Sequence, residues 1–149
     1  MTERGEDGQP LPDGGVVIRF AHKPKDYAGD GKPLPVSFEG SFLLSTDEKE
    51  NPPSRLSVFQ EVLTTPAQGW RLAGSRHTLL LRVSTRDIRG LRKTANNEAI
   101  DVVWHHIDSP LPGAEGHAGI VGWAVESKSR KFFRLKLAEL SDAKEFSGG

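Results

Sequence analysis

The stretch Ala99–Trp123, AIDVVWHHIDSPLPGAEGHAGIVGW, decides the fold of this 149-residue chain. Two apolar runs, Ile100–Ile107 and Ala118–Val125, flank a loop rich in proline and glycine. Short apolar runs bounded by turn residues are typical of strands. The stretch therefore predicts two strands, and a hairpin would pair them in antiparallel fashion.

Further strands are predicted on the N-terminal side of this stretch. Val16–Phe20 is a short apolar run, and Val36–Thr46 alternates apolar with polar residues. Arg55–Leu63 also alternates and fits a strand or a short helix, of which we favour the strand. His77–Val83 contains the nearly continuous run LLLRV, which is typical of a central strand.

One helix is expected directly after that central strand. Ser84 or Thr85 can cap it, and the helix would then extend to about Ala95. Ile88 and Leu91 would face the core. The preceding segment, 64–75, contains one proline and two glycines and predicts a loop.

A second helix is expected at the C-terminal end. Ser127 or Ser129 can cap it, and it would extend to about Phe146. An apolar stripe with helical spacing supports it: Phe133, Leu137 and Leu140. A strand with alternating apolar residues remains an alternative for the same segment.

These elements predict an α+β fold, a mostly antiparallel sheet of about five or six strands with one or two packed helices. The chain length fits a single domain, which we expect over residues 15–146. Residues 1–14 are acidic and rich in glycine and proline, so we expect a disordered tail there.

The composition excludes several classes of protein. The chain has no cysteine, which rules out disulfides, thiolate zinc sites and thiol catalysis. No apolar run is long enough to span a membrane, and the N-terminus lacks the apolar segment of a signal peptide. We therefore expect a cytoplasmic protein without membrane contact.

The loop of the opening stretch gathers the residue types that bind metals or transfer protons. Its candidates for a catalytic or metal-binding role are His106, Asp108 and His117. On a strand, His105 and His106 point to opposite faces, and we expect His105 to be the buried one. A hairpin would let His117 approach His106 or Asp108, as a divalent metal or acid–base catalysis requires. The spacing matches no known metal or catalytic motif, so we expect structural histidines and no cofactor.

Basic residues gather on the first predicted helix and the strand before it. Arg86, Arg89 and Lys93 are spaced to share one helix face, with Arg82 and Arg92 beside them. These five residues form the predicted surface for a partner or an anion. Nucleic acid is a weaker alternative for this surface, because no aromatic residue lies between Arg86 and Lys93 and no nucleic-acid-binding motif is present.

The net charge is zero but unevenly distributed. Between Arg76 and Lys136 there are 11 Lys or Arg and 6 Asp or Glu, whereas the remainder of the chain has 9 and 14. Opposite charge in two regions permits contact with a charged partner or with a second copy. Glycines and lysines also occur together in Lys23–Lys32, but this segment lacks the phosphate-binding GxxxxGK[ST] pattern and predicts a surface loop.

The leading hypothesis is a small non-enzymatic accessory or interaction module that binds a protein partner or self-associates. It would use a sheet edge, the histidine loop or the charged surface. The alternative from a different class is a histidine-dependent metal-binding protein or small hydrolase that uses His106, Asp108 and His117.

Overall fold

A computed structural model describes most of the chain, namely residues 5–21, 55–76, 79–94, 98–122 and 127–146. The predicted strand Val36–Thr46 and the predicted loop Lys23–Lys32 lie outside the described residues. The same holds for residues 1–4 of the predicted tail.

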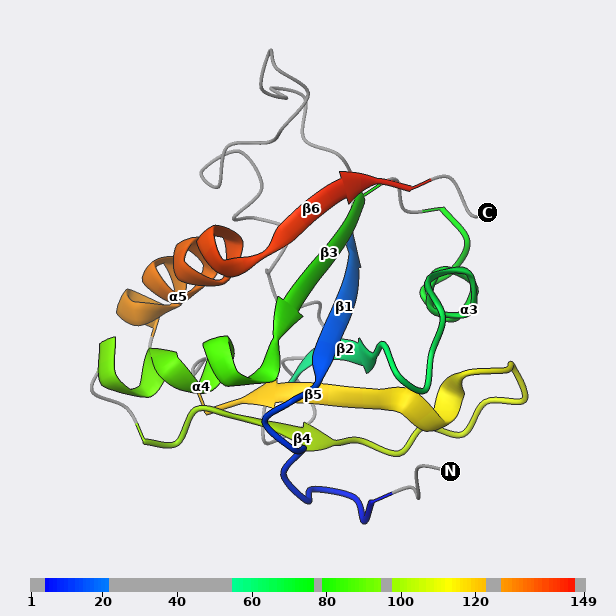
Figure 1. Cartoon of the computed structure of the whole chain (residues 1–149), viewed down its shortest axis with the longest axis horizontal. Coiled ribbons are helices and arrows are strands. Elements are labelled where there is room, and N and C mark those ends of the chain that lie inside the picture. Colours follow the sequence, from blue (N-terminus) through cyan, green and yellow to red (C-terminus); the bar gives the residue numbers. More distant parts are fainter. Residues whose placement is uncertain (1–4, 22–54, 77–78, 95–97, 123–126, 147–149) are drawn as a thin grey trace.

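The described residues form an α+β fold around one six-stranded sheet, as predicted (Figure 1). Every neighbouring pair of strands is antiparallel, and the strand order is β4-β5-β2-β1-β3-β6. The strands are β1 (Val16–Ala21), β2 (Leu56–Gln60), β3 (Leu79–Ser84), β4 (Asp101–Trp104), β5 (His117–Val121) and β6 (Asp142–Glu145).

The hairpin of the opening stretch is confirmed. Strand β4 pairs with β5, with Val102 opposite Ile120 and Trp104 opposite Ala118. A short 3-10 turn, η2 (Ala114–Gly116), precedes β5. It begins after Gly113, whose φ of 91° lies in the left-handed region that favours glycine.

Within the described residues, three helices cover the two faces of the sheet. They are α3 (Pro66–Leu72), α4 (Thr85–Thr94) and α5 (Ser127–Leu140). Figure 1 shows α4 and α5 on one side of the sheet and α3 on the other. The larger core includes Ile88 of α4 and Leu137 of α5, whereas a smaller core on the opposite face packs against Trp70 of α3.

Strand β3 contributes to both cores, which explains its continuous apolar sequence. Leu79 and Leu81 belong to the larger core, and Leu80 between them belongs to the smaller one. All three are at most 1% exposed. A strand with both faces covered needs no polar alternation.

Helix α4 begins where the sequence predicts. The Ser84 hydroxyl accepts a hydrogen bond from the Asp87 backbone N–H at 3.0 Å, so Ser84 supplies the cap. Ile88 and Leu91 are buried as expected. The residues that would end the predicted helix, 95–97, lie outside the described part of the chain.

The prediction of a loop over 64–75 is wrong, because α3 forms there. Thr65 and Gln68 make a capping box, in which the Thr65 hydroxyl accepts from the Gln68 backbone N–H and the Gln68 side chain accepts from the Thr65 N–H. Pro66 occupies the first turn, where its missing N–H is not needed. Pro66 and Gly69, two of the three residues that suggested a loop, are thus part of the helix, and Gly74 follows its end.

The C-terminal helix is shorter than predicted. Helix α5 ends at Leu140, and strand β6 then pairs with β3 at the edge of the sheet. Ser141 turns the chain, with its hydroxyl donating to the Leu137 carbonyl at 2.6 Å. Phe146 packs edge-on against Phe20 and Trp70, and this apolar contact favours the strand path over a longer helix.

Part of the predicted tail lies against the sheet. We refer to residues 5–14 as the N-terminal arm. The arm follows the outer edge of β4 through three backbone hydrogen bonds: Gly8 N–H to the Trp104 carbonyl, Trp104 N–H to the Gln9 carbonyl, and Leu11 N–H to the Val102 carbonyl. Leu11 is 5% exposed and joins the larger core, so one apolar side chain fixes an otherwise polar segment.

Candidate functional site

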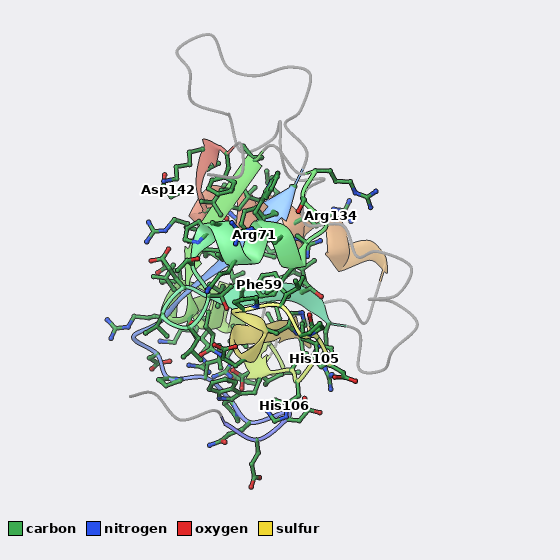
Figure 2. The ribbon with its side chains drawn as sticks, turned by 90° about the vertical axis from the view of Figure 1, so that its right-hand side faces the viewer. Phe59, Arg71, His105, His106, Arg134 and Asp142 are labelled. Carbon is green, nitrogen blue, oxygen red and sulfur yellow. The ribbon has the colours of Figure 1, made fainter. Side chains whose placement is uncertain are left out.

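The hairpin brings His117 to His105 rather than to His106 or Asp108. The two imidazole rings lie 4.8 Å apart between centroids, and Phe59 packs edge-on against His117 at 5.2 Å. Figure 2 labels Phe59, His105 and His106. The His117 Nδ1 donates to the His105 carbonyl at 2.9 Å, so this ring carries a proton on Nδ1. His117 is 5% exposed and is the more buried of the two.

His105 is half-buried, and the expectation that it would be more buried than His106 is confirmed. Burial lowers the pKa of His105 below its ordinary value of 6.5, and the positive charge of Arg55 lowers it further. Within the described residues the His105 Nδ1 has no hydrogen-bond partner. The pair therefore consists of a buried histidine and a half-buried neighbour that resists protonation.

His106 points away from this pair and binds the N-terminal arm. Its backbone N–H donates to the Asp7 carboxylate at 3.0 Å, and its ring Nε2 lies 2.7 Å from the Gly5 carbonyl oxygen. The hydrogen bond from His106 holds the pKa of Asp7 below its ordinary value of 3.8. Asp108 is exposed in the loop beyond.

The described residues contain no group of three or more His, Asp or Glu side chains that could hold a metal ion. The predicted set of His106, Asp108 and His117 is dispersed, because its members lie at the arm, in the loop and beside Phe59. Among these residues, no third His, Asp or Glu side chain joins the His105–His117 pair to complete a metal site.

Three of the five predicted partner-binding residues are used inside the molecule. Arg82 makes a two-pronged contact with Glu61, from Nε at 2.5 Å and from Nη2 at 2.7 Å. Arg92 donates to the Ile100 carbonyl at 2.6 Å and lies 3.3 Å from the Asp101 carboxylate. Arg86 and Lys93 are exposed on α4.

Arg89 is the centre of the contacts that hold the N-terminal arm. Its guanidinium donates to the Leu11 carbonyl at 2.5 Å, the Asp13 carboxylate at 2.5 Å and the Asp101 carboxylate at 2.9 Å. Burial alone would lower the pKa of Arg89, but the two carboxylates raise it. An open groove of about 550 Å³ lies beside these contacts, lined by Arg86, Arg89 and Arg92 and by two aspartates.

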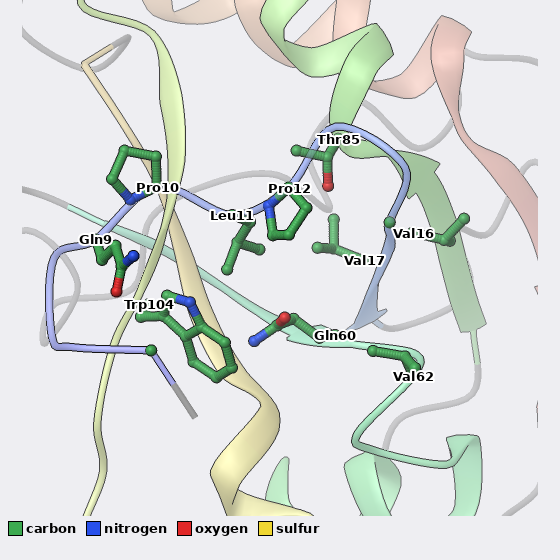
Figure 3. Close-up of a pocket in the computed structure, with 12 residues that line it drawn as sticks. Gln9, Pro10, Leu11, Pro12, Val16, Val17, Gln60, Val62, Thr85 and Trp104 are labelled. Atoms are coloured by element: carbon green, nitrogen blue, oxygen red, sulfur yellow. The ribbon is translucent and has the colours of Figure 1, made fainter. Parts of the chain in front are cut away.

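A second pocket lies between the arm and the sheet and has a volume of about 390 Å³ (Figure 3). We call it the arm pocket. Its walls include Leu11 of the arm, Val17 of β1, Gln60 of β2, Val62, Thr85 of α4 and Trp104 of β4. It combines the apolar lining and the few polar groups that are typical of ligand sites.

The sequence interpretation missed the arm pocket entirely. Its residues come from three strands (β1, β2 and β4), from helix α4 and from the arm, so no local spacing in the sequence connects them. A signal that only the structure provides is Val62, a large apolar residue in the turn after β2 that is 72% exposed.

No family model, curated protein or solved structure matches this chain. None of the helices among the described residues is long and apolar enough to cross a membrane.

Proposed function

We propose that this chain is a small non-enzymatic interaction module that binds an extended segment of a protein partner along the outer edge of β4. The supporting observation is the N-terminal arm, which lies along that edge through three backbone hydrogen bonds and one antiparallel bridge, Pro10 opposite Val103. Strand addition to a sheet edge is a common mode of peptide recognition, in which backbone hydrogen bonds supply affinity and side-chain pockets supply specificity.

The contacts of the arm indicate what such a segment needs. Its three hydrogen bonds with β4 use backbone groups alone, so they make no demand on sequence. Leu11 is the arm side chain that is buried in the core. A partner segment therefore requires an extended backbone and one apolar residue in the place of Leu11.

The opposite edge of the sheet is less suited to this role. Strands β6 and β4 have the same length of four residues, but Asp142 and Lys144 on β6 are exposed, whereas three of the four residues of β4 are buried. Exposed charged side chains on an edge strand oppose pairing with another chain. Of the two edges, β4 is thus the better candidate.

The arm also regulates access, because a partner must displace it. A tethered segment competes at a high effective concentration and weakens the apparent affinity of any external strand. The same exchange between two copies would produce self-association through the same contacts.

A peptide with the sequence of residues 5–14, GEDGQPLPDG, tests this proposal directly. We expect the labelled peptide to bind the full chain weakly, as measured by fluorescence anisotropy. The Leu11→Ala variant of the chain should bind it at least about tenfold more tightly, because removing a buried leucine weakens the competing arm. Sedimentation of both chains would reveal exchange between copies.

The matched control is a peptide in which the residue equivalent to Leu11 is alanine. It should bind the variant chain more weakly than the original peptide does. Equal affinity for wild type and variant, or no binding to either, would overturn the proposal, because the arm would then be a permanent part of the sheet.

A further inference from the structure

A buried hydroxyl group that has no hydrogen-bond partner in the described part of the chain lies at the end of the arm pocket. Thr85 is 0% exposed, and its Oγ1 has no hydrogen-bond partner among the described residues. Figure 3 shows this oxygen directed toward Val17 on the pocket side. The cap of helix α4 does not use it, because Ser84 supplies the cap. Buried polar groups are usually hydrogen-bonded, so this hydroxyl indicates a missing partner.

A second polar group in the same pocket is weakly bound. Gln60 is 6% exposed, and its Nε2 donates to the Gly116 carbonyl at 3.5 Å, the long limit of a hydrogen bond. Figure 3 shows its carboxamide between Trp104 and Val62. A carboxamide can both donate and accept, so it complements a ligand that carries a carbonyl or an amide.

The rest of the pocket is uncharged and mainly apolar, with Gln9 of the arm as a further polar lining residue. Leu11, Val17, Val62 and the Trp104 indole contribute to its walls, and no charged side chain is among its described lining residues. Burying an ionised ligand without a counter-charge would be costly. The lining therefore favours a neutral ligand, and the indole favours an aromatic ring.

We propose that the arm pocket binds a small uncharged molecule with an aromatic or aliphatic body and one carbonyl or amide group. The polar group meets Thr85 Oγ1 and the Gln60 carboxamide, and the body packs against Trp104 and Leu11. The positive end of α4 at Thr85 adds to the attraction for a carbonyl oxygen. The volume of about 390 Å³ lies in the range of small-molecule sites.

This site goes beyond the proposed partner binding. The pocket lies between the arm and the sheet, whereas the proposed partner binds along the outer edge of β4. Leu11 belongs to both, since it closes one wall of the pocket. A ligand in the pocket would therefore hold the arm in place. The test below leaves the arm and the β4 edge unchanged, so its outcome is distinguishable from that of the peptide experiment.

Three probes of similar shape test the ligand class: benzamide, toluene and benzoate. Titration of the full chain, followed by NMR of backbone amides, should give saturable binding of benzamide at millimolar concentrations. Toluene lacks the polar group and should bind about five- to tenfold more weakly, because the hydrogen bonds are lost. Benzoate should bind more weakly than benzamide because its charge has no partner in the pocket.

The Thr85→Val variant removes the hydroxyl and keeps the shape. We expect it to bind benzamide about five- to tenfold more weakly and toluene unchanged, with no loss in thermal midpoint. The matched control is Thr64→Val, since the Thr64 hydroxyl donates to the Gly113 carbonyl at 2.6 Å outside the pocket. That variant should lose stability and keep benzamide affinity. Absence of benzamide binding, or binding that Thr85→Val does not alter, would overturn the proposal.

Discussion

The pKa of Glu61 is lowered chiefly by one neighbour, Arg82. Hydrogen bonds from that guanidinium hold the pKa of Glu61 below its ordinary value of 4.5. The folded state therefore gains stability above pH 4.5 and loses it as the pH falls through the lower folded value. We expect Glu61→Gln to reduce the free energy of unfolding by about 0.5 to 1 kcal/mol at pH 7, because the ion pair with Arg82 is lost. The effect is small because the side chains of Arg82 and Glu61 are 35% and 33% exposed, so solvent screens their attraction.

Urea unfolding at several pH values checks this expectation. The difference between wild type and Glu61→Gln should shrink as the pH falls below 4.5. Glu115→Gln is the matched control, because Glu115 is exposed in the η2 turn and should change stability little. A difference that stays constant down to pH 3 would show that the carboxylate charge has no part in it.

The pKa of His105 should lie below its ordinary value of 6.5, because burial disfavours the charged imidazole. The unfolded chain then binds more protons than the folded one as the pH falls below 6.5, so acid reduces stability in that range. NMR titration of the imidazole should give a midpoint below 6.5 in the folded chain. The Arg55→Ala variant should raise the midpoint, since it removes a nearby positive charge. A midpoint at or above 6.5 would contradict the burial of His105.

From the sequence, the face of the sheet to which a side chain points was easier to predict than the residues that the side chain contacts. Strand alternation correctly separated His105 from His106, because side chains on a strand point to alternate faces. It could not tell that His117 contacts His105, since that depends on the register of β4 against β5. The arginines show the same limit: Arg89 was expected on a surface, but its carboxylate partners lie 12 and 76 residues away along the chain.

At the level of helices, two glycines offer a matched test of packing. A Cβ at Gly69 of α3 would lie 2.8 Å from a ring carbon of Phe20, whereas a Cβ at Gly90 of α4 meets nothing within 4 Å. We expect Gly69→Ala to destabilise the fold by about 1 to 3 kcal/mol through overpacking. Gly90→Ala should stabilise it by about 0.5 to 1 kcal/mol through helix propensity. Thermal unfolding of both variants checks the pair, and equal effects would contradict the close packing of α3 on the sheet.

Arg89 of α4 helps to hold the N-terminal arm, together with the backbone hydrogen bonds to β4 and the buried Leu11. Arg89→Ala removes the donor to Leu11, Asp13 and Asp101, so we expect the arm to detach more often. The backbone N–H groups of Gly8 and Leu11 should then exchange with solvent at least about tenfold faster, since charged hydrogen bonds are each worth about 1.5 kcal/mol or more. Lys93→Ala, an exposed change on the same helix, should leave these rates unaltered. Unchanged exchange in Arg89→Ala would show that β4 alone holds the arm.

Elements with strong local signals were predictable, and elements fixed by distant contacts were not. Helix α4 follows from its cap and its apolar spacing, which need no tertiary information. Helix α3 was missed although Thr65, Pro66 and Gln68 carry a capping signal, because Gly69 argued against a helix. Strand β6 depends on pairing with β3 and on Phe146 packing, and neither is visible in its own sequence.

For the whole molecule, the order of strands in the sheet combines one pairing that the sequence predicts with others that it does not. The β4–β5 pair is a hairpin of neighbouring strands, and the sequence identified it. The order β4-β5-β2-β1-β3-β6 also places β2 between β5 and β1, which are far apart in the chain. No pattern within a strand selects such a neighbour. The arm pocket is one product of this arrangement, and for that reason it could be found only in the fold.

Native-state hydrogen exchange of the full chain tests the central claim most directly. The three amides that join the arm to β4 belong to Gly8, Leu11 and Trp104. If the arm is an exchangeable strand, these amides should exchange through a local opening that is nearly independent of denaturant, while amides of β3 exchange only on global unfolding. The same dependence on denaturant for both groups would mean that the arm opens only with the whole sheet, and would contradict a role for the β4 edge in binding a partner.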